Sequence, residues 1–301
     1  MTAPRPTDRL GEVYAEWAVE MGRYPDMSTE LLRIIFDDWQ RVTGEPEGVT
    51  YKDTEIGGVP GILVTPLDAD PQQVLVLLHG GGFALGSSRS HRKLAGHLAK
   101  AAGVTAFVAD FRLAPEHKFP AAIEDGVAVI RALREAGHRV EDVNLVGDSA
   151  GGNLAIATVL KLRDLGEPLP AQVLTMSPWL NMENTGSTIE TNDATDFLIA
   201  REGLQANIDR YIDGVASPTD PLANPLYADL TGFPRLYITA ADTESLFDDS
   251  VQLNERAKAA GVDVTFSIGE GMQHVFPFLA GRHERADEEI RRMAEWYRAG
   301  R

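Results

Sequence analysis

Strand-like and helix-like segments alternate over most of the chain after residue 70. Short runs of aliphatic and β-branched residues are each followed by a segment with apolar residues at helical spacing, beginning with a strand at 74–78 and a helix at 92–102. Alternation of this kind produces right-handed crossovers, so consecutive strands lie parallel and helices cover both faces of the sheet. The pattern therefore predicts an α/β fold with a mostly parallel central sheet flanked by helices.

The rest of the chain completes this sheet and adds segments outside it. Further strands are predicted at 104–109, 143–146, 171–176, 236–240 and 264–268, and further helices at 121–136, 150–165, 245–260 and 286–298. A hairpin at the sheet edge is predicted for 49–66, with its turn at Gly57 and Gly58. Residues 1–48 are predicted to be helical, and residues 181–214 interrupt the alternation as an insertion with one or two helices. No repeat or linker divides the chain into independent domains.

The composition limits the partners of the protein. The 301 residues contain 45 Asp and Glu against 28 Lys and Arg, which gives a formal net charge of −17. Such a chain repels polyanions, and this argues against nucleic acid or anionic lipid as partner. No apolar stretch approaches the ~18 residues of a membrane span, and the first residues lack the apolar core of a signal peptide. We therefore expect a cytoplasmic protein that binds neither membrane nor nucleic acid.

Metal and thiol chemistry have little support in the sequence. The chain has no cysteine, which excludes disulfides, thiolate nucleophiles and cysteine-rich metal sites. Besides His79, four histidines precede residue 149, in helix-like or loop surroundings without metal-ligand spacing. We interpret these four as surface residues: His91, His97, His117 and His138. We expect no metal site.

A serine stands at the tightest strand-to-helix junction of the predicted sheet. The segment GDSAGG follows the strand at 143–146, and Gly147, Ser149 and Gly151 fill the pattern G-x-S-x-G. Small residues two positions either side of the serine allow a sharp turn that holds its hydroxyl out of the sheet. Because reactive groups of α/β proteins gather at the carboxyl ends of strands, Ser149 is the candidate nucleophile.

A serine nucleophile needs a base and a third group that orients this base. Two histidines follow Ser149 in the chain: His274 lies in a loop after the strand at 264–268, while His283 stands among charged residues at a helix start. His274 is therefore the candidate base. The loop after the strand at 236–240 supplies the acid, and from the residues alone Asp242 and Glu244 remain alternatives.

Three glycines directly follow a strand and a histidine in the segment HGGGF. A dinucleotide-binding loop would need a further glycine where Leu85 stands, and a Gly-Lys-Ser/Thr phosphate loop is absent from the sequence. A flexible linker does not fit inside an alternating core. We therefore predict an oxyanion hole in which Gly81 and Gly82 donate backbone N–H groups, together with Ala150 after the nucleophile.

Four motifs together resemble the hormone-sensitive-lipase-like esterases of the α/β-hydrolase fold, also called bacterial family IV esterases. They are HGGGF (79–83), DFRLAPEHKFPAA (110–122), GDSAGG (147–152) and HVF (274–276), in the order typical of that family. The resemblance implies a cofactor-free serine carboxylesterase acting on short- to medium-chain esters. It also implies a helical cap formed by residues 1–48 and 181–214, over a catalytic core of residues 49–180 and 215–301.

The resemblance also assigns roles within the site. The segment ESLFDD places Glu244 at the aligned acid position, as in a branch that resembles monoterpene lactone hydrolases, so Glu244 becomes the expected acid and Asp242 its alternative. His79 is expected to position the oxyanion loop. The cap aromatics Trp17 and Phe36, and Phe83 beside the glycines, are candidates for substrate binding.

Other functions share this machinery. The same triad could open a lactone or deacetylate a small metabolite, and a non-catalytic ligand-binding homologue is a further alternative, disfavoured because His274 is present. The expected partner is a small-molecule ester. Some relatives dimerise through an edge strand, so a homodimer is among the assemblies that the resemblance allows.

Overall fold

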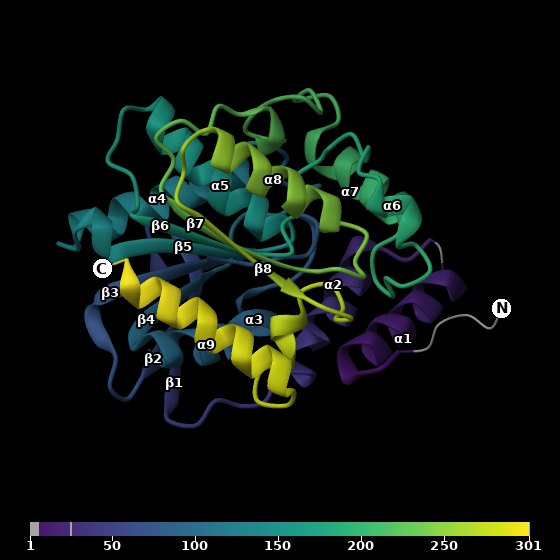
Figure 1. Cartoon of the computed structure of the whole chain (residues 1–301), viewed down its shortest axis with the longest axis horizontal. Coiled ribbons are helices and arrows are strands. Elements are labelled where there is room, and N and C mark those ends of the chain that lie inside the picture. The colour runs from purple at the N-terminus through teal and green to yellow at the C-terminus, as the bar shows by residue number, and fades with distance from the viewer. Residues whose placement is uncertain (1–5, 25, 301) are drawn as a thin grey trace.

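The predicted strands form one eight-stranded sheet with the order β1-β2-β4-β3-β5-β6-β7-β8 (Figure 1). The computed structural model describes residues 6–24 and 26–300. β2 runs antiparallel to both of its neighbours, and all other neighbouring strands are parallel. The strands are β1 (Val49–Ile56), β2 (Val59–Pro66), β3 (Asp70–Leu78), β4 (Val104–Ala109), β5 (Val143–Asp148), β6 (Gln172–Met176), β7 (Arg235–Ala241) and β8 (Val264–Gly269). The predicted hairpin at the sheet edge and the predicted fold class are confirmed.

Helices cover both faces of the sheet (Figure 1). α3 (Ser88–Ala102) and α9 (Glu284–Ala299) lie on one face, and α4 (Ala121–Glu135), α5 (Ala150–Asp164) and α8 (Phe247–Ala259) lie on the other. α3 begins four residues before the predicted start, because the Ser87 hydroxyl accepts a hydrogen bond from Ser90 N and the Ser90 hydroxyl accepts one from Ser87 N. The residues of this reciprocal cap are not apolar. The spacing of apolar residues alone therefore predicted a helix start that is too late in the sequence.

Two apolar clusters, one on each face, hold the sheet. Successive residues of β3 alternate between them: Val74, Val76 and Leu78 belong to one cluster, and Leu75 and Leu77 to the other. β4, β5 and β6 are buried along their whole length. This burial on both faces is the reason why these strands are mostly apolar in sequence and do not alternate strictly between apolar and polar residues.

The remaining helices lie together beside the carboxyl ends of the parallel strands (Figure 1). They are α1 (Arg9–Arg23) and α2 (Thr29–Asp37) from the amino-terminal segment, and α6 (Thr188–Thr191) and α7 (Arg201–Ile212) from the insertion. The two helices of the insertion agree with the expectation from the sequence. We call residues 6–48 and 181–214 the cap; residues 1–5 and 25 of the predicted first cap segment lie outside the described residues. The division into cap and core stays a prediction.

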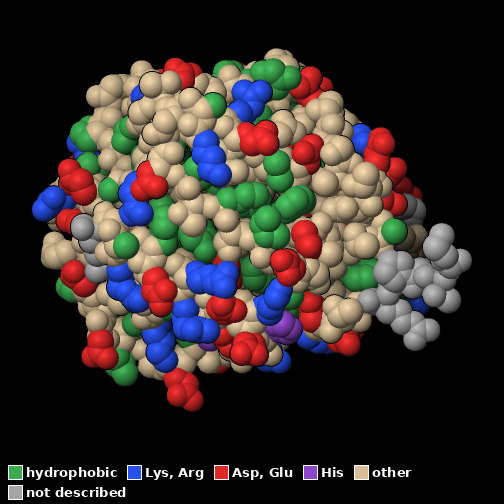
Figure 2. All heavy atoms as spheres, in the orientation of Figure 1, with side chains coloured by type: hydrophobic (Ala, Val, Ile, Leu, Met, Phe, Trp, Pro, Cys, Tyr) green, Lys and Arg blue, Asp and Glu red, His purple; other side chains and the backbone are tan. Residues whose placement is uncertain are grey.

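The surface mixes acidic and basic side chains. Figure 2 shows them interspersed around one face, with apolar side chains gathered across its middle, where Figure 1 shows β8 between α8 and α9. β8 is the edge strand there, and 45% of Ile268 is exposed. No helix in the described ranges is long and apolar enough to cross a bilayer. The homodimer expected from the resemblance stays a prediction.

Candidate active site

Ser149 occupies the turn between β5 and α5. Its backbone has φ 51° and ψ −122°, a conformation that residues with a Cβ rarely adopt. The turn is so tight that a Cβ on Gly147 would overlap the carbonyl oxygen of Gly151, which explains the glycine at position 147. Ser149 N donates to Met176 O on the neighbouring strand at 2.9 Å. The fold thus holds a strained serine at the carboxyl end of a central strand.

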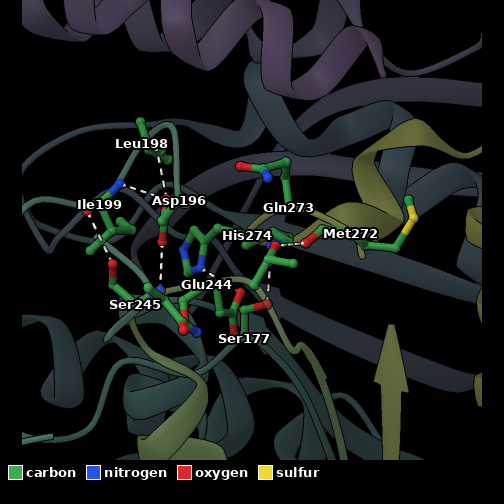
Figure 3. Close-up of polar contacts among 12 residues, drawn as sticks. Ser177, Asp196, Leu198, Ile199, Glu244, Ser245, Met272, Gln273 and His274 are labelled. Carbon is green, nitrogen blue, oxygen red and sulfur yellow. Dashed lines mark hydrogen bonds and ion pairs between the residues drawn. The ribbon is translucent and has the colours of Figure 1, made fainter. Parts of the chain in front are cut away.

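His274 and Glu244 come together from neighbouring loops. Glu244 follows β7, His274 follows β8, and Glu244 Oε2 lies 3.0 Å from His274 Nδ1 (Figure 3). Both side chains are almost completely buried. His274 Nε2 has no hydrogen-bond partner among the described residues, and His274 and Ser149 line the same cavity. The imidazole is therefore oriented through one nitrogen while its other nitrogen remains available.

Asp242, the alternative acid, has a different position. Its Oδ1 accepts a hydrogen bond from Gly271 N at 2.7 Å, in the loop that leads from β8 toward His274. Among the residues that the structure describes, the carboxylate hydrogen-bonded to His274 is that of Glu244. Asp242 binds the backbone of the turn at Glu270 and Gly271, because a carboxylate can cap an N–H group that a turn leaves free. Of the two carboxylates left open by the sequence, the fold brings Glu244 to the imidazole.

Three residues outside the predicted triad hold the Glu244–His274 pair in place. Ser177 Oγ accepts a hydrogen bond from Val275 N, and Asp196 Oδ2 accepts one from Ser245 N at 2.7 Å (Figure 3). Tyr14 in α1 donates its hydroxyl hydrogen to His274 O at 2.9 Å. Ser177 follows β6, and a polar residue at the end of a strand is a sequence signal that could have identified it. Asp196 and Tyr14 reach the site only through the tertiary fold.

The charges around His274 favour its protonated form. Burial by itself would lower the pKa of His274, but the adjacent Glu244 carboxylate, followed by Asp196 and Asp148, outweighs burial and raises that pKa above its ordinary value. An imidazolium formed in this position is stabilised by its surroundings. Such an imidazole accepts a proton more readily than a histidine in water.

The glycine loop after β3 leaves bare backbone at Gly81 and Gly82. Gly81 and Gly82 have φ values of +115° and +63°, and a Cβ on Gly82 would overlap Nδ2 of Asn207 in α7. Among the described residues, none accepts a hydrogen bond from the N–H of Gly81 or Gly82. Ala150 is the first residue of α5, so its N–H has no partner within that helix. These glycines line the same cavity as Ser149 and His274.

A buried polar cluster supports this glycine loop from behind. Asp148 Oδ1 accepts a hydrogen bond from Gly80 N, and Asp148 Oδ2 lies 3.2 Å from His91 Nε2. His79 Nδ1 lies 2.8 Å from Gly80 O. Burial, followed by the charge of His91, lowers the pKa of His79 to about 4, so His79 is neutral at pH 7 and its Nδ1–H donates to that carbonyl.

The interpretation of His91 as a surface residue is wrong. His91 is completely buried, with Trp39 and Phe278 at its edges and Asp148 at its Nε2. It lies on the apolar face of α3, and the carboxylate that satisfies it comes from a strand distant in the sequence. Of the other three, His117 is exposed, while His97 and His138 are partly exposed. In the described part of the chain, no three His, Asp or Glu side chains converge in a way that could hold a metal ion.

Comparison with known proteins identifies the family. The sequence pattern of the alpha/beta hydrolase fold family matches residues 75–278. The chain belongs to this family. The hydrolase is 38% identical over 264 residues to an acetyl-hydrolase of Streptomyces hygroscopicus. The aligned region covers 82% of this chain and 88% of that protein. It is 32% identical to an esterase of Acinetobacter venetianus over 90% of this chain and 89% of that one.

A solved structure extends the likeness over the whole length. The crystal structure of an esterase from the bacterial hormone-sensitive lipase family superposes on the hydrolase with a TM-score of 0.93 and 36% identity, covering 100% of this chain and 99% of the other. The family resemblance stated from the four motifs is therefore confirmed. The hydrolase is a hormone-sensitive-lipase-like member of the α/β-hydrolase fold.

A cavity of about 390 Å³ lies between the cap and the core of the hydrolase. Ser149, His274, Gly81 and Gly82 lie in its wall on the side of the core. The cap contributes mainly apolar side chains, and α7 adds polar ones; the cap residues are Met21, Tyr24, Met27, Leu32, Phe36, Trp39, Leu198, Ile199, Ala200, Glu202, Gly203, Leu204, Ala206, Asn207 and Arg210. These four residues thus line a space that a small molecule fits.

Only one of the three substrate-binding candidates lines this cavity. Phe36 does, as expected. Phe83 instead stacks on Tyr211 of α7 with ring centroids 3.8 Å apart, and it is buried beneath the cavity wall. Trp17 packs against Phe36 and faces a groove on the outer side of α1 and α2. Both side chains are used for aromatic packing instead: Phe83 packs between core and cap, and Trp17 packs against other aromatic residues within the cap.

Proposed function

We propose that this hydrolase is a serine carboxylesterase with the catalytic triad Ser149, His274 and Glu244. Its relatives identify it as a carboxylic ester hydrolase. The observation that carries the proposed mechanism is the 3.0 Å contact between Glu244 Oε2 and His274 Nδ1, which leaves Nε2 available in the cavity that Ser149 also lines. A serine becomes nucleophilic only beside such an oriented base.

The proposed reaction has two halves. His274 Nε2 takes the proton from Ser149 Oγ as the oxygen attacks the ester carbonyl, and it then gives this proton to the departing alcohol. Water then attacks the acyl-enzyme while His274 removes a proton from the water, and His274 returns this proton to Ser149 Oγ as the carboxylic acid leaves. Glu244 stabilises the imidazolium in both halves. The hydrogen bond from Ser149 Oγ to His274 Nε2 forms when substrate binds. Catalytic hydrogen bonds are commonly longer in the free enzyme and shorten in the complex with substrate.

The oxyanion hole proposed for this reaction consists of the N–H groups of Gly81, Gly82 and Ala150. Support comes from the bare backbone that lines the same cavity as Ser149, and from the lack of acceptors for the Gly81 and Gly82 N–H groups in the described residues. Donors placed in advance at the position of a developing negative charge stabilise the transition state without reorganisation. His79, which donates to Gly80 O, and Asp148, which accepts from Gly80 N, would keep this loop in position.

The size and lining of the cavity favour short to medium acyl chains. About 390 Å³ with mostly apolar cap residues suits a small ester rather than a long-chain triglyceride. A lactone or an acetylated metabolite would use the same triad, and similarity to an acetyl-hydrolase keeps the second of these among the candidates. A ligand-binding protein without catalysis would not need the His274–Glu244 pair.

The proposal is tested by initial rates on p-nitrophenyl esters from acetate to palmitate, with Ser149→Ala as the blank. We expect rates that peak at short to medium chains and fall on the order of 10⁴-fold or more in the variant. A variant as active as the wild type would refute Ser149 as nucleophile. Activity on long chains only, with none on acetate or butyrate, would refute the assignment of chain length.

A further inference from the structure

One wall of the cavity carries a cation without an acidic partner. Arg210 in the last turn of α7 lines the cavity, and its Nη1 donates to Asn207 Oδ1 at 2.8 Å. No carboxylate within the described ranges forms an ion pair with it. Arg210 is the only lysine or arginine among the described residues that line this cavity.

The position of Arg210 relates it to the reacting centre. The Asn207 amide lies directly against Gly82, since a Cβ on Gly82 would overlap Nδ2. Arg210 follows Asn207 by three residues, so the two side chains share one face of α7, about one turn or 5 Å apart along the helix. The Arg210 guanidinium therefore lies a short distance beyond the proposed oxyanion hole.

The other charges near Arg210 do not neutralise it. Glu202 also lines the cavity, but it is exposed in the first turn of α7, about 12 Å from Arg210 along the helix. Asp209 is exposed and accepts a hydrogen bond from Gln205 Nε2. The remaining N–H groups of the Arg210 guanidinium are thus available to a hydrogen-bond acceptor inside the cavity.

We propose that Arg210, held by Asn207, forms a subsite for a carboxylate on the substrate, so that the preferred esters carry a free carboxylate a few carbon atoms from the scissile bond. This inference rests on the proposed function and narrows its substrate class. The apolar side chains of α2 and its surroundings, such as Leu32 and Phe36, would receive the uncharged arm of the same ester. A guanidinium binds a carboxylate through two parallel hydrogen bonds, which gives direction as well as affinity.

The experiment compares each acidic ester with its neutral counterpart. The substrates are the monoethyl esters of succinate, glutarate and adipate, and the same molecules with the free carboxylate replaced by a primary amide. Acetate esters of 4-hydroxybutyrate and 4-hydroxybutyramide place the carboxylate on the alcohol side. The rate of hydrolysis is measured by titrating the carboxylic acid that is released at constant pH. The quantity compared is the kcat/KM of the ester with the free carboxylate divided by the kcat/KM of its amide counterpart.

We expect the acid to exceed the amide by roughly 10- to 100-fold in at least one pair, which is the range of a charge-assisted contact. Arg210→Gln should reduce that ratio roughly 10-fold or more, Arg210→Lys should retain part of it, and 0.5 M KCl should reduce it in the wild type by screening. Arg291→Gln, at an exposed position of α9, removes the same charge and should leave the ratio unchanged. The salt dependence tests the subsite even if a variant fails to fold.

Two results would overturn the inference. One is a wild-type ratio near one in every pair, and the other is a ratio that survives in Arg210→Gln. Either result is distinguishable from failure of the proposed function. If the wild type hydrolyses neutral p-nitrophenyl esters and Ser149→Ala does not, the esterase function still holds.

Discussion

Glu244 Oε2 lies 3.0 Å from His274 Nδ1, although the two residues are 30 positions apart in the sequence and follow different strands. β7 and β8 are parallel neighbours, with Ala241 paired to Gly269 at their ends. Their following loops therefore leave the sheet at the same edge, and the carboxylate meets the imidazole there. This contact is the basis of the first two predictions.

Glu244→Gln should lower kcat on the order of 10⁴-fold with little change in KM, because an amide neither stabilises the imidazolium nor fixes the productive tautomer. Asp242→Asn is the matched control from the same loop, and it should change kcat by less than about threefold, because Asp242 contacts Gly271 N rather than His274. Steady-state kinetics of the two purified variants decide the point. The reverse order of effects would make Asp242 the acid.

The acidic limb of the pH profile should lie above the ordinary pKa of histidine. His274 must be neutral to accept the serine proton, and Glu244 with Asp196 and Asp148 raises its pKa, so activity should fall as the pH drops through that raised value. Removing the negative charge lowers the pKa, so the residual activity of Glu244→Gln should have its acidic limb at a lower pH. The profile of kcat/KM for wild type and variant measures both positions, and an unmoved limb would contradict the assignment of His274.

Gly82→Ala should reduce kcat by roughly 10²- to 10³-fold, the usual effect of losing an oxyanion donor. The added methyl would overlap Asn207 Nδ2 and push the loop away from Ser149. Gly58→Ala controls for backbone strain alone, because Gly58 has φ +80° in the β1–β2 turn and nothing within 4 Å of an added Cβ. Equal kcat in the two variants would show that the Gly82 N–H does not act in the transition state.

His91→Phe should lower the free energy of unfolding by about 3–5 kcal/mol, because it leaves the buried Asp148 carboxylate without its imidazole partner. Phenylalanine fits the aromatic surroundings of Trp39 and Phe278, so lost packing contributes little. Urea unfolding measures the change.

Two further variants complete that test. His117→Phe, at an exposed loop position, should leave the free energy of unfolding almost unchanged. Adding Asp148→Asn to His91→Phe should restore part of the loss, since a neutral amide is easier to bury than an unpaired carboxylate. No loss of stability in His91→Phe would mean that Asp148 finds another partner.

The sequence by itself determined the order of the elements, the sheet, and the positions of Ser149, His274 and the glycine loop. These follow from local properties: the period of apolar residues, the small residues that a tight turn requires, and the rule that reactive groups follow strands. The amino acids after β7 also limited the acid to two neighbouring carboxylates, and the motif order identified the family.

The tertiary structure decided which of several side chains of similar chemistry meet. It brought Glu244 rather than Asp242 to His274, buried His91 against Asp148, and used Phe83 and Trp17 for packing instead of for the cavity wall. It also placed Asn207 against Gly82 and hydrogen-bonded Arg210 to Asn207 in the wall of the same cavity. Such pairings depend on the register of strands and the docking of the cap, and these arise from contacts between residues far apart in the chain, which no local pattern records.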